Sequence, residues 1–409
     1  MDPEGAPGSW RRTWLTVIGA GVAVAAAAGV GLSTFFAAMS TPLHPNLAEV
    51  PSVRLTAPSR EWAGAVERAR QRARSALVER NLPGLSVAVG VNGELAWAEG
   101  FGWADLERRV PVTPRSRFRI GHVSKTLTSA AAGLLLEKGK LDLDEDIRTY
   151  VPGYPRKQWT VTLRQLMAHT AGIRHYESEA DSRPTAHCER AAEGVSGFGN
   201  DPLRFQPDTA SAYSTFGWIL VSAAVEAAAN EPFFAFMRSR IFDPLGMRDT
   251  TTDAVTSEIP DLATFYSPRL SGDTAFGPEL AAPADYSCFA GAGAFLSTPS
   301  DMVRFGMALN GGTLLRPATV SMLQEPQRLL SGEQTRDGLG WSLETFSLAG
   351  RPALAATDAS RTVLGSSTSF MTFPEHGIVV AVMSNTSSAS LWPIALELAQ
   401  SLAEQKTSP

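Results

Sequence analysis

The sequence predicts an α+β fold in which an antiparallel sheet, flanked by helices, is completed by both ends of the chain. Two β-rich runs within 85–105 flank Asn92-Gly93, a strong signal for a hairpin. Four further β-rich runs lie within 338–385, and segments with helical periodicity fill most of the sequence between the two regions. We therefore expect a helical part inserted between two sheet-forming parts.

The composition is that of a large globular protein without a basic surface. The chain has 409 residues, of which 44% are hydrophobic and 19% charged, and its formal net charge is −5. This length suffices for one sizeable domain or two closely packed subdomains. The acidic balance gives no support for nucleic-acid binding. Cys188 and Cys288 lie far apart, without C-x-x-C or ligand-spaced histidines, so a disulfide and two unrelated thiols both remain open, and no metal or cofactor is expected.

The amino-terminal region contains a long uncharged segment. Residues 1–13 are polar and include Arg11-Arg12, whereas residues 14–39 are apolar or small throughout. About 20 such residues span a bilayer as a helix, while the core of a signal peptide has about 7–15. We expect a membrane anchor with the folded part extracytoplasmic, because the arginines precede the span; secretion after signal cleavage is the alternative. Residues 40–57, with three prolines, are expected to form a linker.

The folded region is expected to span 58–409. Its sheet is assigned to 58–120 and 335–409, and its helical part to about 121–334. An amphipathic helix rich in Arg, Glu and Ala, at 59–81, precedes the first strands. Further helices are expected within 161–176, 211–230, 232–247, 290–312 and 391–405, and a long surface loop at 177–209.

The stretch from Phe118 to Lys140 organises the rest of the chain. It reads as a loop followed by a helix, with apolar residues three and four positions apart and Gly139 where a C-terminal cap is required. The first turn of such a helix exposes free backbone N–H groups. His122 lies there, three residues before Lys125, so this helix start is the first candidate site.

Five segments follow one another in a characteristic order: FRIGHVSK, LMAHTAGI, AYSTFGWIL, GAGAFLSTPSDMVRFG and GLGW. Together they resemble the serine β-lactamase and penicillin-binding-protein superfamily over roughly residues 60–405. Within it, the chain looks most like the class C and esterase-like branch, especially the mitochondrial serine β-lactamase-like proteins and their bacterial relatives. The resemblance implies a β-lactamase/transpeptidase-like fold, with the active site at the junction of the sheet and a helical subdomain.

The family uses three motifs. In S-x-x-K the serine attacks a carbonyl and the lysine takes its proton, since residues three apart share a helix face. In Y-x-N, or Y-S-T in the mitochondrial-like branch, the tyrosine acts in proton transfer. K-T-G or H-x-G on a strand at the sheet edge lines the site and positions one N–H group of the oxyanion hole.

Two of the three motifs depart from the family pattern in this chain. Lys125 matches the lysine and Tyr213 matches the tyrosine, but His122 occupies the position of the nucleophilic serine. Residues 359–361 (Ala-Ser-Arg) stand where H-x-G is expected. The resemblance thus implies catalytic candidates and substrate-binding candidates, which are His122, Lys125 and Tyr213 for catalysis and Ser214, Thr215 and Thr362 for substrate.

Neither neighbouring serine is expected to replace the nucleophile. Ser124 points about 100° away from Lys125 around the helix, and Ser129 lies a turn deeper and should face the core. His122 could itself attack a substrate or act as a base for water. Lys125 should lower the pKa of a nearby histidine by charge repulsion, which suits a base and an inert ring equally.

Two functions of different class follow. The preferred one is a catalytically impaired family member that binds a peptide-like or acyl ligand, or acts through protein contacts. The alternative is an active hydrolase of an ester, amide or peptide bond that uses His122, Lys125 and Tyr213. His169 and His175 are expected to pack a loop rather than to bind a metal.

Overall fold

The computed structural model describes residues 42–55, 57–183, 185–254, 258–270, 272–360 and 364–407. The expected anchor at 14–39 and the candidate residue Thr362 lie outside these ranges. Within them, no single helix has the length and apolar character needed to cross a membrane, although two helices bent by 76°, Thr215–Ala229 and Phe233–Phe242, have them jointly.

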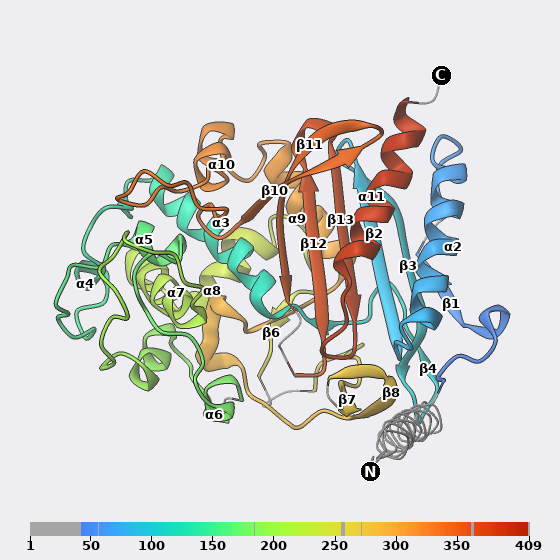
Figure 1. The fold of residues 1–409 in the computed structure, drawn as a ribbon, viewed down its shortest axis with the longest axis horizontal. Coiled ribbons are helices and arrows are strands. Elements are labelled where there is room, and N and C mark those ends of the chain that lie inside the picture. The colour runs from blue at the N-terminus through green and yellow to red at the C-terminus, as the bar shows by residue number, and fades with distance from the viewer. Residues whose placement is uncertain are drawn as a thin grey trace, which may run out of the picture.

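The main sheet of the described residues has eight strands in the order β1-β3-β2-β13-β12-β11-β10, with β4 paired to β3, and every pair is antiparallel (Figure 1). At its centre β2, from the first part of the chain, pairs with β13 from the last part, so that Leu85 faces Ser384 and Val91 faces Ile378. This arrangement confirms the predicted α+β fold. The strands are Ser52–Arg54 (β1), Gly84–Val91 (β2), Glu94–Asp105 (β3), Val110–Pro111 (β4), Ser342–Leu348 (β10), Arg351–Ser360 (β11), Ser367–Phe373 (β12) and Ile378–Ser384 (β13).

The hairpin between β2 and β3 follows the expected turn chemistry. Asn92 and Gly93 both have positive φ, 51° and 90°, as a two-residue turn requires if its twist is to match that of the strands. The predicted hairpin is confirmed, and it starts the sheet to which the carboxyl-terminal strands are later added.

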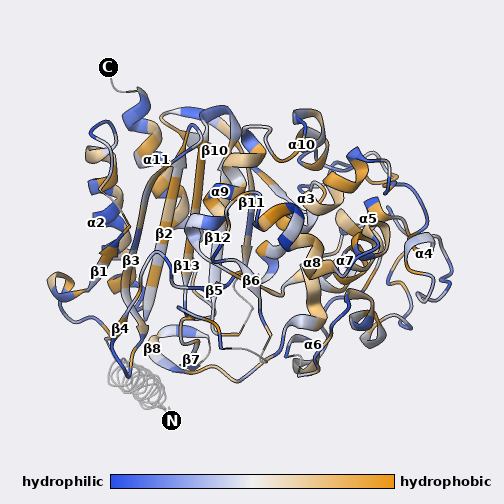
Figure 2. Ribbon diagram, turned by 180° about the vertical axis from the view of Figure 1, so that it is seen from behind, coloured by the Kyte–Doolittle hydropathy of each residue, from blue (hydrophilic) through white to orange (hydrophobic). Residues whose placement is uncertain are grey.

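Helices cover both faces of the main sheet. On one face lie α2 (Ala63–Glu79) and α11 (Trp392–Thr407), whose buried side chains form one core with β2, β13 and β12. In Figure 2, α2 carries both hydrophilic and hydrophobic turns, as expected for a helix with one buried face. On the other face α9 (Pro299–Asn310) packs so closely that a Cβ on Gly306 would lie 2.6 Å from Val379 Cγ1. Its N-cap is Thr298, whose side chain accepts from Asp301 N.

The helical part lies beside the sheet and has α7 in its interior (Figure 1). The segment at 177–209, expected to be a loop, contains a short helix and a 3₁₀ turn. The remaining helical elements are α3 (Ser124–Glu137), α4 (Ile147–Tyr150), α5 (Leu163–Met167), α6 (Glu179–Ser182), η3 (Ala191–Gly197), α7 (Thr215–Ala229), α8 (Phe233–Met237), η4 (Arg238–Phe242), η5 (Ser287–Ala292) and α10 (Pro317–Leu323).

Two small sheets complete the structure, and the sequence pattern did not reveal them. β5 (Phe118–Arg119), β9 (Phe295–Ser297) and β6 (Thr251–Thr252) form one. β7 (Tyr266–Leu270) and β8 (Asp273–Leu280) form a separate hairpin at the lower end of the main sheet in Figure 1.

Part of the segment at 40–57, for which a linker is expected, is regular structure in its described residues. Within it, Leu47–Glu49 forms a 3₁₀ turn and β1 pairs with β3, with Val53 opposite Gly100. Prolines are tolerated beside an edge strand, because such a strand needs to donate hydrogen bonds on one side only. The sheet therefore begins before residue 58.

The two cysteines form a disulfide between Cys188 and Cys288, whose Cα atoms are 4.8 Å apart. The bond joins the segment before η3 to the start of η5, 100 residues away in sequence. Of the two alternatives left open by the sequence, the structure has the paired one.

Candidate active site

His122 lies at the junction of the helical part and the main sheet. It belongs to the 3₁₀ turn η2 (Gly121–Val123), which leads directly into α3. Gly121 begins this turn with φ of 50°, a conformation that suits glycine. The ring of His122 is partly buried, and its Nε2 lies 3.2 Å from Thr215 Oγ1. The imidazole therefore lies beside the first residue of α7 and contacts the Thr215 hydroxyl.

Lys125 is buried and engaged on two sides. Its side chain is 6% exposed, and Nζ lies 3.2 Å from Asp358 Oδ2 on β11. The same nitrogen lies 4.5 Å from the centroid of the Tyr213 ring, within range of a cation–π interaction. The ammonium group is thus held between a carboxylate and an aromatic face.

The ion pair controls the protonation of the lysine. Burial by itself lowers the pKa of Lys125, but the Asp358 carboxylate and the Tyr213 hydroxyl outweigh it and raise that pKa above its ordinary value. Burial raises the pKa of Asp358 to about 6, although the charge of Lys125 opposes this. At neutral pH both groups are charged, so the lysine cannot accept a proton.

Tyr213 stands at the centre of three histidines. The distances from its ring centroid are 4.6 Å to His169, 5.1 Å to His175 and 5.3 Å to His122. The side chain is 38% exposed, an unusual fraction for a large ring in this protein. Desolvation of the hydroxyl raises the pKa of Tyr213, and the nearby Lys125 charge only partly offsets this. Tyr213 is therefore protonated at neutral pH.

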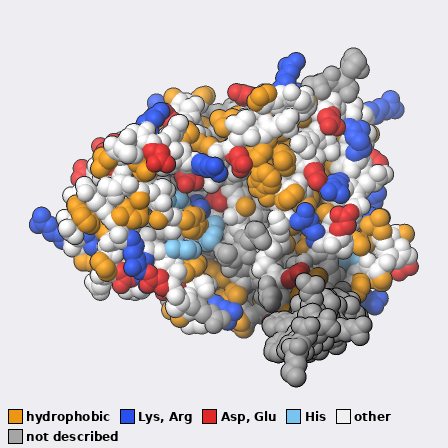
Figure 3. Space-filling view, in the orientation of Figure 1, with side chains coloured by type: hydrophobic (Ala, Val, Ile, Leu, Met, Phe, Trp, Pro, Cys, Tyr) orange, Lys and Arg blue, Asp and Glu red, His pale blue; other side chains and the backbone are white. Residues whose placement is uncertain are grey.

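The histidines around Tyr213 are neutral. Burial, followed by repulsion from Lys125 and then from His175, lowers the pKa of His122 to about 3. Burial and the Lys125 charge also lower the pKa of His169 and that of His175. Figure 3 shows histidine side chains gathered in a hollow between the helical part and the sheet. Among the described residues, no group of three or more His, Cys, Asp or Glu side chains is arranged to hold a metal ion.

The two serines near the expected nucleophile are both enclosed. Ser124 is fully buried, and Ser129 is buried with its hydroxyl donating to Leu339 O at 2.6 Å. The expectation that Ser129 faces the core is confirmed. Neither hydroxyl is open to a substrate.

Ser214, for which a substrate-binding role is expected, caps a helix in this structure. Its hydroxyl accepts from Gly217 N at 3.1 Å and so caps α7, and it donates to Arg174 O at 2.7 Å. A serine immediately before a helix is often used in this way. Thr215 does approach the candidate site, through its contact with His122.

Asp358 is the site residue that the sequence did not reveal. It lies one position before the segment 359–361, in which the family motif was sought, and successive residues of a strand point to opposite faces. Asp358 and the buried Ser360 thus share one side of β11, whereas Ala359 is exposed. Asp358 is the single acidic residue of this strand, RPALAATDAS, and that was the available signal.

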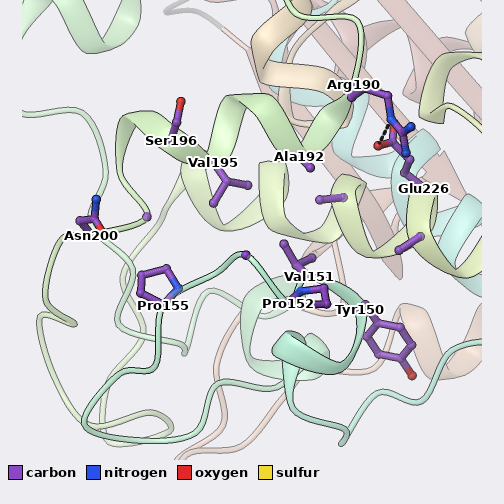
Figure 4. A pocket seen from close by; sticks show the side chains of 14 residues that line it. Tyr150, Val151, Pro152, Pro155, Arg190, Ala192, Val195, Ser196, Asn200 and Glu226 are labelled. Carbon is purple, nitrogen blue, oxygen red and sulfur yellow. Dashed lines mark hydrogen bonds and ion pairs between the residues drawn. The ribbon is translucent and has the colours of Figure 1, made fainter.

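The space at His122 is small. A cavity of about 10 Å³ is lined by Gly121, His122, Tyr176, Ser182, Tyr286, Phe289 and Gly293, which is room for about one water molecule. A larger cleft of about 370 Å³ lies between the loop after α4, η3 and α7 (Figure 4). Its charged groups are Arg190 and Glu226, which pair at 2.8 Å, and it has no nucleophile next to a base. The chemistry of the fold is therefore to be sought at His122.

Comparison with known proteins identifies the family. Residues 65–403 match the family model described as Beta-lactamase. The chain belongs to the beta-lactamase family. It is 28% identical to the mitochondrial serine beta-lactamase-like protein LACTB of Homo sapiens, over 83% of this chain and 80% of that protein. It is 27% identical to penicillin-binding protein 4* of Bacillus subtilis, over 65% and 61% of the two chains.

Solved structures of beta-lactamase-like proteins have the same fold. A penicillin-binding protein homologue from Pyrococcus abyssi has a TM-score of 0.68 and 21% identity, over 81% of this chain and 76% of that one. A D-amino acid amidase from Ochrobactrum anthropi has a TM-score of 0.67 and 22% identity, over 83% and 99%. At such identities these structures bear on the fold alone.

Proposed function

We propose that this chain is a beta-lactamase-family protein that no longer forms an acyl-enzyme and instead binds a peptide-like or acyl ligand at the surface around Tyr213. The proposal rests above all on the ion pair between Lys125 and Asp358. In S-x-x-K chemistry the lysine must be neutral to take the hydroxyl proton. Here a carboxylate 3.2 Å from Nζ favours the charged amine.

The replacement of the nucleophile supports the same conclusion. His122 stands at the serine position, and its pKa of about 3 makes the neutral imidazole a weak base. An acyl-imidazole would also be far more labile than an acyl-serine ester. On the side of the ring that faces Tyr176 and Phe289, the cavity of about 10 Å³ has no room for a substrate carbonyl.

The class of ligand is inferred from the relatives and from the exposed ring. The relatives include proteins named as penicillin-binding proteins, which suggests peptide-like and acyl compounds. Tyr213 presents a partly exposed aromatic face beside a buried cation, and such a face suits the apolar part of an acyl or peptide group.

Reaction with an active-site probe tests the proposal. Wild-type protein should remain unlabelled by a fluorescent penicillin and by a fluorophosphonate, as read from its intact mass. His122→Ser should gain slow labelling, and His122→Ala, which removes the ring but adds no nucleophile, should gain none. Labelling of the wild type that disappears on substitution of one residue in this site would overturn the proposal.

A second candidate function is hydrolysis of an ester, amide or peptide bond by His122, Lys125 and Tyr213. The observation in its favour is that these three side chains converge, with His122 neutral. Turnover of a nitrophenyl ester by the wild type, lost in Lys125→Ala with Tyr213→Phe, would establish it. Turnover that survived both substitutions would come from elsewhere.

We also propose that residues 14–39 anchor the chain in a membrane, with the folded part on the extracytoplasmic side. The disulfide between Cys188 and Cys288 supports an oxidising compartment, in agreement with the position of Arg11-Arg12 before the apolar run.

A further inference from the structure

The first described residues are hydrogen-bonded to the folded part. Leu43 N donates to Asn81 Oδ1 at 2.8 Å. His44 is buried, and its Nε2 lies 2.9 Å from Leu82 O and 3.2 Å from Pro83 O. The chain is thus attached to the end of α2 from residue 43 onward.

The sequence leaves only a short connection before this attachment. The apolar run ends at Met39, and the four residue steps from Met39 to Leu43 can span at most about 14 Å when fully extended. If the run crosses a bilayer, as proposed above, Leu43 stands within that distance of the lipid. The surface around Leu43 must then face the membrane.

The hairpin of β7 and β8 surrounds this attachment point. A cleft of about 550 Å³ is lined by Pro42 together with hairpin residues 272–275, and a cleft of about 610 Å³ by Leu43 together with residues 278–280. Thr274 Oγ1 donates to Arg80 O at 2.7 Å, which braces the hairpin against the end of α2. The hairpin and the start of the described chain therefore share one surface.

Apolar side chains are exposed at both ends of the hairpin. Leu280, which pairs with Tyr266 at one end, is 69% exposed, and Leu270, which pairs with Asp273 beside the turn at the other end, is 37% exposed. The charges beside them are mixed, with Arg108 and Arg269 near acidic neighbours, so they favour neither sign of partner strongly. Apolar groups among mixed charges suit the interface of a zwitterionic bilayer.

We propose that the hairpin of β7 and β8 docks on the bilayer surface, with Leu270 and Leu280 inserted at the lipid interface. The anchor brings the folded part to the membrane, and the hairpin fixes its orientation there. This contact is separate from the site at His122 and rests on the proposed anchoring of residues 14–39.

Fluorescence of the full-length protein in phosphatidylcholine nanodiscs tests this contact. Because both native cysteines lie in the disulfide, a single added cysteine can be labelled with an environment-sensitive fluorophore. Leu280→Cys and Leu270→Cys report on the hairpin. Leu330→Cys is the matched control, since Leu330 is also 69% exposed but lies in the segment between α10 and β10.

Labels at 280 and 270 should be several-fold less quenched by iodide than the label at 330, and should be quenched by doxyl-labelled lipid when the label at 330 is not. Equal iodide quenching at 280 and 330 would overturn the docking while leaving the anchor intact. Protection from iodide without quenching by doxyl lipid would also overturn it, in favour of a protein contact. A chain that does not co-purify with the nanodiscs would overturn both the anchor and the docking.

Discussion

Removal of the Asp358 carboxylate in a chain with serine at position 122 tests whether the ion pair keeps Lys125 from acting as a base. His122→Ser supplies a hydroxyl at the position of the nucleophile, but Lys125 beside it remains paired with Asp358. The double variant His122→Ser with Asp358→Asn keeps the shape of the carboxylate side chain and removes its charge. We expect this double variant to acylate much faster at neutral pH than the single variant.

The size of the effect follows from the 3.2 Å separation of Lys125 Nζ and Asp358 Oδ2. At an effective dielectric constant of about 20, two unit charges at this distance attract by about 5 kcal/mol. At 1.36 kcal/mol for each tenfold change, the loss of this attraction increases the fraction of neutral amine by roughly a thousandfold or more. Burial then lowers the pKa of Lys125, because no opposing charge remains beside it.

The assay is the rate of labelling by a fluorescent penicillin, measured from pH 5 to pH 10. In the single variant the amine is neutral only above its raised pKa, so labelling should appear only toward the alkaline end. In the double variant the rising limb of the profile should lie several pH units lower. Asp253→Asn in the same background is the matched control, because Asp253 forms an equally buried ion pair, with Arg119 at 2.7 Å. It should leave the profile unchanged.

Superimposable pH profiles for the single and the double variant would refute the reasoning. They would mean that the ion pair does not hold the amine in its charged form. The reaction would then be limited by residues 359–361, which stand where the family motif H-x-G is expected. Thermal unfolding of each variant separates this outcome from a loss of the folded state.

Three further predictions concern stability, and denaturant unfolding monitored by circular dichroism checks each. Gly291→Ala should lower the free energy of unfolding by about 2–3 kcal/mol, because the new Cβ would lie 2.0 Å from Thr128 Oγ1. Gly153→Ala is the control and should leave stability nearly unchanged, since no atom lies within 4 Å of its new Cβ. Equal effects of the two substitutions would contradict this packing. Replacement of Cys188 and Cys288 by serine should lower the free energy of unfolding by about 4 kcal/mol, since the disulfide closes a loop of about 100 residues. Unchanged stability would show that the disulfide is absent. Ser214→Ala should lower the free energy of unfolding by about 1 kcal/mol, because α7 loses its N-cap. Unchanged stability together with weaker ligand binding would instead support a role of Ser214 in substrate binding.

The parts of the fold that local sequence encodes were predictable. The turn at Asn92-Gly93 needs positive φ at both residues, and few other pairs adopt it readily. The helix after His122 showed its periodicity, and Gly139, with φ of 63°, ends it as expected. The convergence of His122, Lys125 and Tyr213 followed from the order of the family motifs, and the structure brings these side chains together.

Features that depend on distant contacts were not predictable. The partner of Lys125 lies more than 200 residues away on β11, and no local pattern says which residue of a strand will face a given helix. The hairpin of β7 and β8 includes Pro268 and Pro278, which weaken a strand signal. β1 was missed because three residues beside prolines resemble a linker until an edge of the sheet is present to pair with them.

The proposed loss of the nucleophile and the pairing of Lys125 with Asp358 fit together physically. Burying a charged ammonium without a partner costs several kcal/mol of desolvation free energy, and the neutral amine avoids this penalty. In a site with a serine, the neutral amine is also the form that accepts the hydroxyl proton. With His122 at that position, as proposed, a neutral amine has no hydroxyl proton to accept, and Asp358 stabilises the charged form 3.2 Å away. On this proposal Lys125 is a buried cation and not a base, so His122→Ser alone should give only part of the family's chemistry.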